Sequence, residues 1–166
     1  MSITEERKKK IDFTVKYYNT PAKLVAKKGA GFDDTAAGLK GKRLGVQRAT
    51  THQCSAEKLF PGAELVLYAT QEEVWQDLSA GRLDAQLSDS LQAYEGFLAL
   101  DAGSGFDFLG DAIDDVECQG VGAGFAVRKE DSALRDQLSQ IILDIRADGT
   151  YKAMNDKYFA VDIYGN

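Results

Sequence analysis

The sequence "RLGVQRATTHQC" at residues 43–54 decides the fold, because it changes from a strand pattern to a helix pattern within a few residues. Residues 43–46 form a mainly apolar run that is typical of a buried strand, and a loop of small and hydroxyl residues follows it. Thr50 and Gln53 fit the capping box with which many helices begin. The stretch therefore predicts a strand that turns directly into a helix.

The same strand-then-helix pattern occurs three times in the middle of the chain. The expected strands are residues 42–47, 63–69 and 83–89, and the expected helices are residues 51–60, 71–82 and 90–100. Thr70 and Glu73 form a second capping box, and Gly81 fits a helix C-terminus. Alternating strands and helices of this length predict βαβ units around a mainly parallel sheet. The expected fold class is therefore α/β.

The two ends of the chain have a different pattern. We expect a strand at residues 11–18, an extended segment at residues 22–29, a short strand at residues 106–112, another strand at residues 124–129, and helices at residues 132–149 and 151–159. The first of these helices carries an apolar stripe of Leu134, Leu138, Ile141, Ile142 and Ile145. Residues 101–124 are rich in Gly and Asp, so we place a domain boundary there.

Composition excludes several classes of function. A net charge of −6 and a pI near 4.8 argue against nucleic-acid binding, which needs a basic surface. The sequence contains no apolar run of about 20 residues that would span a membrane, and residues 1–13 lack the apolar core of a secretory signal. With one His and no metal-ligand spacing, we expect neither a metal site nor a cofactor.

Cys54 and Cys118 are the only cysteines, so the chain forms one disulfide or none. Their separation of 64 residues excludes a C-x-x-C motif. A disulfide requires an oxidising compartment and Cα atoms within about 7 Å of each other. Two structural thiols are the alternative, and the sequence leaves both open.

Two strand ends carry the chemistry of a binding site, because parallel α/β sheets bind ligands beyond the carboxyl ends of their strands. Thr50, Thr51 and the backbone N–H groups of their helix start suit a carboxylate, and Asp89 suits an ammonium group. Together they would complement a zwitterionic amino acid, and Arg7 could add a bidentate contact to the carboxylate. Each residue has a plainer interpretation as well: Thr50, Thr51 and Asp89 as helix caps, and Arg7 as a surface arginine.

Ser2 and His52 each allow a binding role and a plainer one. Ser2 and Glu5 fit another capping box, so Ser2 is a candidate helix cap. His52 has no nucleophile or orienting acid beside it in the sequence, which favours a binding protein over an enzyme. A polar side chain near the ligand is the more modest role for His52.

Several stretches resemble the amino-acid class of bacterial periplasmic solute-binding proteins, in particular the lysine/arginine/ornithine- and histidine-binding members. They are "SITEERKKKIDFT", "LKGKRLGVQRATT", "DLSAGRLDAQLSDSLQAYEGFL", "AVRKEDSALRD" and "IRADGTYKAMNDKYFAVDIYG". The resemblance implies a periplasmic-binding-protein-like type II fold, with two lobes joined by two hinge strands. It also implies a periplasmic location, an ABC-transporter permease as partner, and a cationic amino acid as ligand.

The resemblance assigns roles to seven residues. Arg7 and Thr51 would hold the ligand carboxylate, Asp89 the ammonium, and Ser2 the amino-acid head group. Gln47, Thr50 and His52 would line the cleft.

The resemblance begins well inside the family's first lobe. We therefore expect residues 1–19 and 119–166 to be a remnant of the first lobe, and residues 20–118 to be a nearly complete second lobe. Half of a cleft would bind an amino acid weakly or not at all. The uncovered apolar stripe of residues 132–148 predicts a homodimer of the fragment.

Two other functions are compatible with this fold. A lyase- or dehydratase-type enzyme on the same fold is the main alternative, with His52 as its only acid–base candidate near neutral pH. The effector-sensing domain of a transcription regulator has a similar fold, but it predicts a helix-turn-helix upstream of the domain.

Overall fold

The computed structural model describes residues 1–159 and 161–165. The chain divides into two compact units. One consists of Met1–Thr20 and Gln119–Asn166, and we call it the split unit. The other is Pro21–Cys118, and we call it the sheet unit. No helix among the described residues is both long and apolar enough to cross a membrane.

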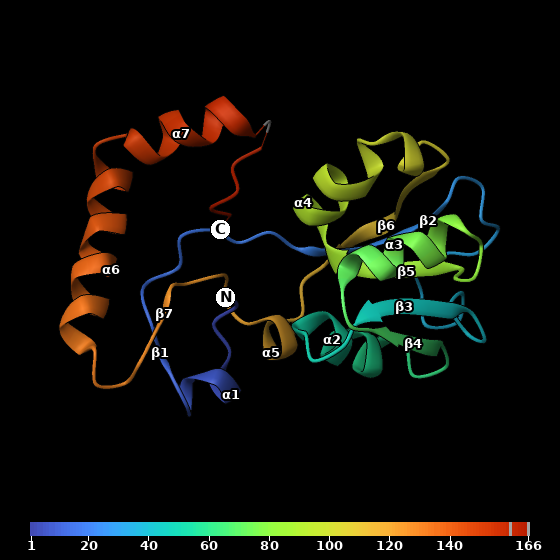
Figure 1. The fold of residues 1–166 in the computed structure, drawn as a ribbon, viewed down its shortest axis with the longest axis horizontal. Helices are drawn as coiled ribbons and strands as arrows, with labels where there is room; N and C mark the ends of the chain where they lie inside the picture. Colours follow the sequence, from blue (N-terminus) through green and yellow to red (C-terminus); the bar gives the residue numbers. More distant parts are fainter. Residues whose placement is uncertain (160, 166) are drawn as a thin grey trace. The chain divides into compact units, whose positions relative to one another are not determined.

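The sheet unit is built on five strands in the order β4-β3-β5-β2-β6 (Figure 1). Their bounds are β2 (Ala22–Lys27), β3 (Arg43–Gln47), β4 (Glu64–Tyr68), β5 (Ala85–Asp89) and β6 (Phe106–Ile113). Strand β3 pairs in parallel with β4 and β5, whereas β2 pairs antiparallel with β5 and β6. Four strands therefore run in one direction and β2 runs against them. The predicted α/β class is confirmed.

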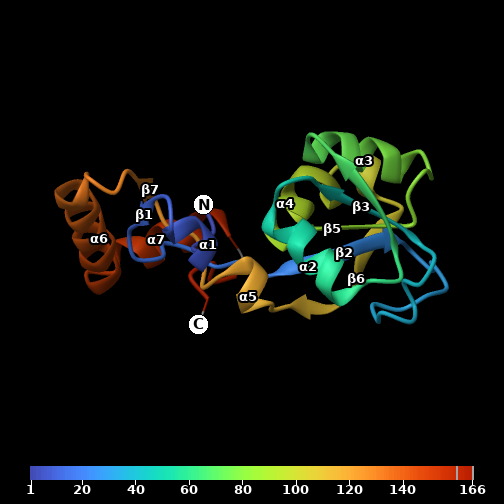
Figure 2. The ribbon, with the colours of Figure 1, turned by 90° about the horizontal axis from the view of Figure 1, so that it is seen from below.

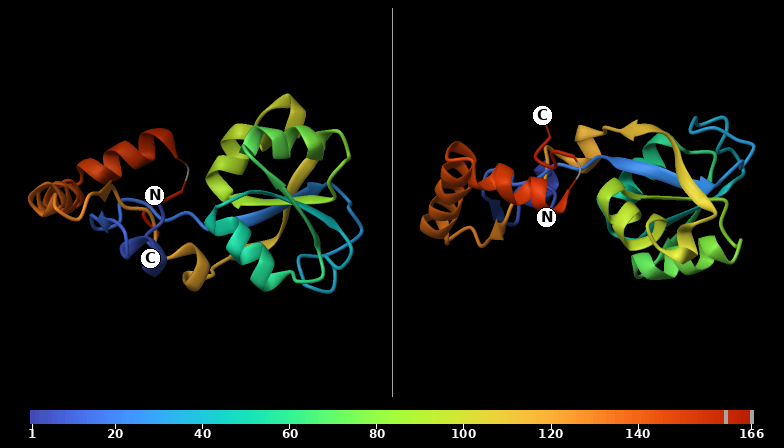
Figure 3. Two further views of the ribbon diagram at one scale, coloured as in Figure 1. Left: turned by 60° about the horizontal axis from the view of Figure 1, so that its bottom comes forward. Right: turned by 90° about the horizontal axis from the view of Figure 1, so that it is seen from above.

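Helices cover both faces of this sheet (Figure 3). They are α2 (Thr51–Leu59), α3 (Gln71–Ser79), α4 (Ser90–Ala93), the π-helix η1 (Tyr94–Leu98) and the 3-10 helix η2 (Asp101–Gly103). The short helix α5 (Val116–Gln119) follows β6 beyond the end of the sheet. Helix α2 packs Ala56 against Leu44 and Leu87 on one face. Helix α3 packs Val74 and Leu78 on the other face, together with α4 and η1. Alternate residues of β3 and β5, namely Leu44, Val46, Ala85 and Leu87, belong to the core under α2. The positions between them, Gly45 and Gln86, are buried as well, as expected for strands that are covered on both sides.

Two elements of the sheet unit differ from the prediction. The helix expected at residues 90–100 is divided into one α-turn and one π-turn. Gly96 lies in the π-turn so close to Trp75 that a Cβ atom there would overlap the indole ring. Strand β6 has eight residues instead of the short strand that was expected, because it pairs with β2 along nearly its whole length.

The split unit contains α1 (Glu5–Lys8), a two-stranded sheet of β1 (Asp12–Phe13) and β7 (Ala126–Val127), α6 (Ser132–Ala147) and α7 (Thr150–Tyr158). Figure 2 shows α6 and α7 in orange and red, with α6 beside β1 and β7. The strands predicted at residues 11–18 and 124–129 are therefore wrong in length. Only two residues of each form the ladder, because these segments have just one partner strand among the described residues.

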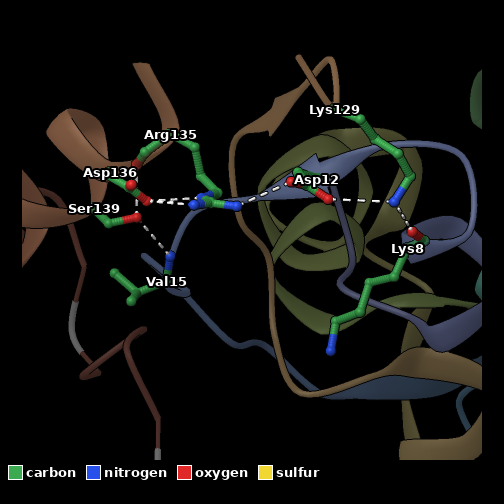
Figure 4. A network of polar contacts seen from close by, with 7 residues as sticks. All are labelled: Lys8, Asp12, Val15, Lys129, Arg135, Asp136 and Ser139. Atoms are coloured by element: carbon green, nitrogen blue, oxygen red, sulfur yellow. Dashed lines mark hydrogen bonds and ion pairs between the residues drawn. The ribbon is translucent and has the colours of Figure 1, made fainter. Parts of the chain in front are cut away.

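Polar contacts centred on Asp12 fasten α6 to β1 (Figure 4). The Asp12 carboxylate accepts a hydrogen bond from Arg135 Nη1 at 3.0 Å and lies 3.4 Å from Lys129 Nζ. Ser139 Oγ accepts a hydrogen bond from the backbone N–H of Val15 at 3.2 Å. Lys129 Nζ also donates to the backbone carbonyl of Lys8 at 2.8 Å. This network sets the direction of α6 where strand pairing is short.

The apolar stripe of α6 is only partly covered. Ile142 is 4% exposed, whereas Leu134 and Ile141 are 48% and 49% exposed. Ile142 and Ile145 line an apolar hollow of about 230 Å³ together with Tyr17, Phe125 and residues of α7. The predicted apolar stripe is therefore present on α6, but only part of it is buried and the rest faces outward.

Candidate functional site

The predicted binding residues of the sheet unit lie at one edge of its sheet. Strands β3 and β5 are adjacent and parallel, with Leu44 opposite Ala85 and Gly45 opposite Gln86. Gln47 and Asp89 end these two strands, so their carboxyl ends meet at the same edge. Helix α2 leaves β3 over one face, and α4 leaves β5 over the other. This divergence is the topological switch point at which open α/β sheets bind ligands.

The turn after β3 is fixed by the hydroxyl of Thr50. Its Oγ1 donates to the Gln47 carbonyl at 2.6 Å and accepts from the Gln53 N–H at 3.2 Å. Thr50 is therefore the N-cap of α2, as the plainer interpretation predicted. The Gln53 side chain does not complete the expected box with the Thr50 N–H, and instead accepts from the N–H of Ala49 at 2.7 Å. Ala49 has φ = 59°, a left-handed conformation that alanine rarely adopts.

Thr51 is the first residue of α2. Within residues 1–159 and 161–165, its hydroxyl makes no hydrogen bond to another protein group, and neither do the backbone N–H groups of Thr50 and Thr51. The first turn of a helix carries N–H groups without helical partners and a partial positive charge. The turn can therefore donate several hydrogen bonds to one anionic group.

Asp89 is both the last residue of β5 and the N-cap of α4. Its Oδ1 accepts from the Gln92 N–H at 2.9 Å, so the capping interpretation holds in the structure. The neighbouring Ser90 N–H donates to the Pro21 carbonyl at 2.9 Å, which fixes the strand end against β2. The Asp89 carboxylate is therefore engaged as a helix cap, at the carboxyl end of β5.

The other predicted residues fall in three places. Gln47 turns its amide toward the end of β4, where Nε2 donates to the Ala69 carbonyl at 3.1 Å. His52 is half-buried in the first turn of α2. Ser2 and Arg7 belong to the split unit, where Arg7 Nη1 donates to the Ser2 carbonyl at 3.0 Å. The capping box expected for Ser2 is wrong, because α1 begins two residues later than this box requires and Thr4 caps it through the Arg7 N–H.

Cys54 and Cys118 are joined by a disulfide, with Cα atoms 5.5 Å apart. The bond fastens α2 to the start of α5. Lys58, one helical turn beyond Cys54, reinforces it with a 2.8 Å contact to Asp115 and a 2.7 Å contact to Glu117. Sequence reasoning missed Lys58 and Asp115. The available signal was an aspartate three residues before Cys118, whose Oδ1 accepts the Cys118 N–H at 3.4 Å.

Residues 1–161 match the protein family described as "Bacterial extracellular solute-binding proteins, family 3". The chain belongs to this family. An L-arginine-binding protein of Pseudomonas aeruginosa is 49% identical over 168 residues, which cover 100% of this chain and 65% of the relative. The histidine-binding periplasmic protein of Salmonella typhimurium is 42% identical, with 99% and 64% covered. The lysine/arginine/ornithine-binding periplasmic protein of Escherichia coli is 39% identical, with 100% and 65% covered.

Solved structures agree with this family assignment. An ancestral arginine-binding protein bound to arginine superposes with a TM-score of 0.84 at 31% identity, covering 96% of this chain and 69% of that one. The type II periplasmic-binding-protein fold expected from the resemblance is confirmed. The chain spans about 65% of the length of the curated relatives it matches. These three relatives are named as binding proteins, and two of them as periplasmic proteins.

Proposed function

We propose that this chain is part of the solute-binding component of an amino-acid ABC transporter and recognises a polar or cationic L-amino acid. The observation that carries the proposal is the placement of the Thr50–Thr51 turn and Asp89 at the adjoining ends of β3 and β5. The names of the relatives support arginine, histidine, lysine or ornithine as the ligand.

The two halves of the zwitterion have complementary partners in the sheet unit. In this proposal the α-carboxylate accepts hydrogen bonds from the Thr51 hydroxyl and from the backbone N–H groups at the start of α2, next to its positive end. The α-ammonium donates to Asp89, whose charge also caps α4. Both contacts use groups on rigid elements, so the sheet unit needs little rearrangement to bind the head group.

Four further residues are proposed as ligand contacts from the resemblance. Arg7 would add a carboxylate contact and Ser2 a head-group contact, while Gln47 and His52 would line the site. The hydrogen bonds Arg7–Ser2 and Gln47–Ala69 hold two of these side chains in defined positions. We further propose that residues 1–19 and 119–166 correspond to part of the first lobe, and residues 20–118 to the second.

Location and partners follow from the same family. We propose a periplasmic protein that delivers its ligand to a membrane permease and catalyses no reaction. The binding-protein names of the relatives support this over the lyase alternative. Conversion of a bound amino acid that is lost in His52→Ala would favour the enzyme instead.

We also propose that two copies of this chain associate through the outward half of the α6 stripe. Leu134 and Ile141 lie seven residues apart on one side of α6 and are half-exposed. The short β1–β7 sheet is of a size that is barely stable without further partners. A symmetric contact would cover the same stripe in both copies.

Nuclear magnetic resonance titration of the ¹⁵N-labelled chain with L-arginine tests the proposed function. We expect binding in the millimolar range, with the largest shifts at the amides of Thr50, Thr51 and Asp89. Lysine, ornithine and histidine should act at the same amides, and the α-keto acid of arginine, which lacks the ammonium group, should bind more weakly. Saturable binding that leaves these amides unshifted would reject the proposed site, and binding in the micromolar range or tighter would contradict the expectation that half of a cleft binds weakly.

A further inference from the structure

Helix α2 carries a covalent and an ionic attachment on the same face. Cys54 and Lys58 are four residues apart, so they are neighbours on the helix surface. Both reach the short segment from Asp115 to Cys118: Cys54 through the disulfide, and Lys58 through Asp115 and Glu117. Figure 1 shows α5 next to α2.

The segment that they hold lies beyond the end of the sheet. The pairing of β6 with β2 ends at Ile113, opposite Ala22. Past this point Asp115 and Cys118 are buried, whereas Val116 between them is 56% exposed. The two inward-pointing residues are the ones bonded to α2, so these bonds decide whether the segment stays in place.

The two cysteines differ in exposure. Cys118 is only 6% exposed, whereas Cys54 lies on the exposed side of α2. Thiol–disulfide exchange proceeds by attack of a thiolate on an accessible sulfur, and the other sulfur leaves. An incoming thiolate should therefore attack Cys54 Sγ and release Cys118.

We propose that the Cys54–Cys118 disulfide is a redox-controlled latch, which locks residues 114–118 onto α2 when oxidised and leaves them held by Lys58 alone when reduced. The reductant is an external dithiol. Its first thiolate forms a mixed disulfide with Cys54, and Cys118 leaves as a thiolate that takes a proton from water. The second sulfur then attacks the mixed disulfide, releases Cys54, and closes the dithiol into a cyclic disulfide. The protein gains two electrons and two protons.

In the reduced protein the Lys58 contacts keep residues 114–118 loosely attached to α2 instead of letting them unfold. Lys58 is 43% exposed, so its ion pairs are screened by solvent and reversible. The Asp115 carboxylate still accepts the Cys118 N–H. The reduced segment should therefore open and close locally while the sheet remains intact. This inference concerns the sheet unit alone and does not depend on the proposed ligand.

Hydrogen–deuterium exchange of the full chain, oxidised and after treatment with dithiothreitol, tests the latch. We expect the amides of residues 116–118 to exchange about tenfold faster after reduction, while β5, which opens only with the whole sheet, stays much better protected than these residues in both redox states. The double variant Cys54→Ser/Cys118→Ser should show the fast exchange without reductant. In Lys58→Met the amides of residues 116–118 should stay protected while the disulfide is oxidised. After reduction they should exchange faster than in the reduced wild type. Equal exchange in both redox states, or loss of protection throughout β2–β6 on reduction, would overturn the proposal.

A trapping experiment tests the direction of attack. The oxidised chain is treated with a monothiol such as 2-mercaptoethanol and then alkylated with iodoacetamide. Mass spectrometry should find the mixed disulfide on Cys54 and the alkyl group on Cys118. A mixed disulfide on Cys118 with the alkyl group on Cys54 would show that the thiolate attacks Cys118 and would contradict the mechanism.

Discussion

Gln53 holds Ala49 in a left-handed conformation by accepting its backbone N–H at 2.7 Å. The same turn is closed from the other side by the Thr50 hydroxyl, which accepts the Gln53 N–H. At the start of α3 the equivalent Glu73 carboxylate accepts the N–H groups of both Ala69 and Thr70. The α2 turn thus leaves the Thr50 N–H available, at the cost of a strained alanine.

Replacing Ala49 with glycine should stabilise the protein. A left-handed alanine costs about 1–2 kcal/mol, which the glycine variant avoids. Glycine in turn lowers stability by about 0.5–1 kcal/mol, because it has more freedom to lose from the unfolded chain. We expect a net gain of about 0.5–1 kcal/mol in the free energy of unfolding by urea. The control is Ala80→Gly, because Ala80 is exposed and has an ordinary φ of −76°. That variant should be destabilised, and equal effects at both positions would contradict the strain argument.

Asp89→Asn separates the two roles of Asp89. Asparagine caps helices as well as aspartate does, so stability should change by only a few tenths of a kcal/mol. The charge is lost, however, and the dissociation constant for arginine should rise about tenfold or more, since hydrogen bonds between charged groups are worth about 1.5–3 kcal/mol. Resonance titration and urea unfolding of the same samples measure both quantities. Unchanged affinity would leave Asp89 as a cap only.

The central βαβ pattern was predictable because each element there carries its own signal. Leu44 and Val46 lie two residues apart and face the same core, and the Thr70–Glu73 box marks the start of α3. The ends of the chain were less predictable. Residues 11–18 alternate like a strand, yet a strand's length depends on its partner, and β7 pairs only with Asp12 and Phe13.

The candidate site was predictable to the same extent. Thr50, Thr51 and Asp89 follow strand patterns, so their meeting at one edge follows from a parallel sheet. The contact of Lys58 with Asp115 spans 57 residues and has no local pattern. It depends on how the segment after β6 packs against α2, which no local sequence pattern specifies.

The Lys58–Asp115 pair should make stability depend on pH below about pH 5. Burial alone would raise the pKa of Asp115, but hydrogen bonds from Lys58 and the Cys118 N–H together lower it below its ordinary value of 3.8. A lowered pKa in the folded state means that the stabilisation is present at neutral pH and is lost as pH falls through that pKa. Asp115→Asn should therefore be less stable than wild type at pH 7, with a smaller difference at pH 3. A difference independent of pH would contradict this.

Removing the disulfide should lower the stability of the whole chain substantially. The bond closes a loop between residues 64 positions apart. The chain-entropy relation gives about 4 kcal/mol for a loop of this length. Urea unfolding of Cys54→Ser/Cys118→Ser and of reduced wild type should both show this loss relative to the oxidised wild type. A loss confined to the double variant would indicate a packing effect of the serines.

The association of two chains through α6 makes the last prediction. Leu134 and Ile141 are about half-exposed on one side of the helix, and covering a side chain of this size is worth about 1.5–3 kcal/mol. Light scattering should give the mass of a dimer for wild type. Leu134→Glu/Ile141→Glu should give a monomer, because association would bury two charges in each copy.

Its control is Ala133→Glu/Gln140→Glu, which adds the same charges with the same spacing about 100° further round the helix. Ala133 and Gln140 are exposed, so this variant should remain a dimer. A wild-type chain that is a monomer at all concentrations, with α6 resistant to protease, would reject the association. Equal dissociation of both variants would place the contact on another face.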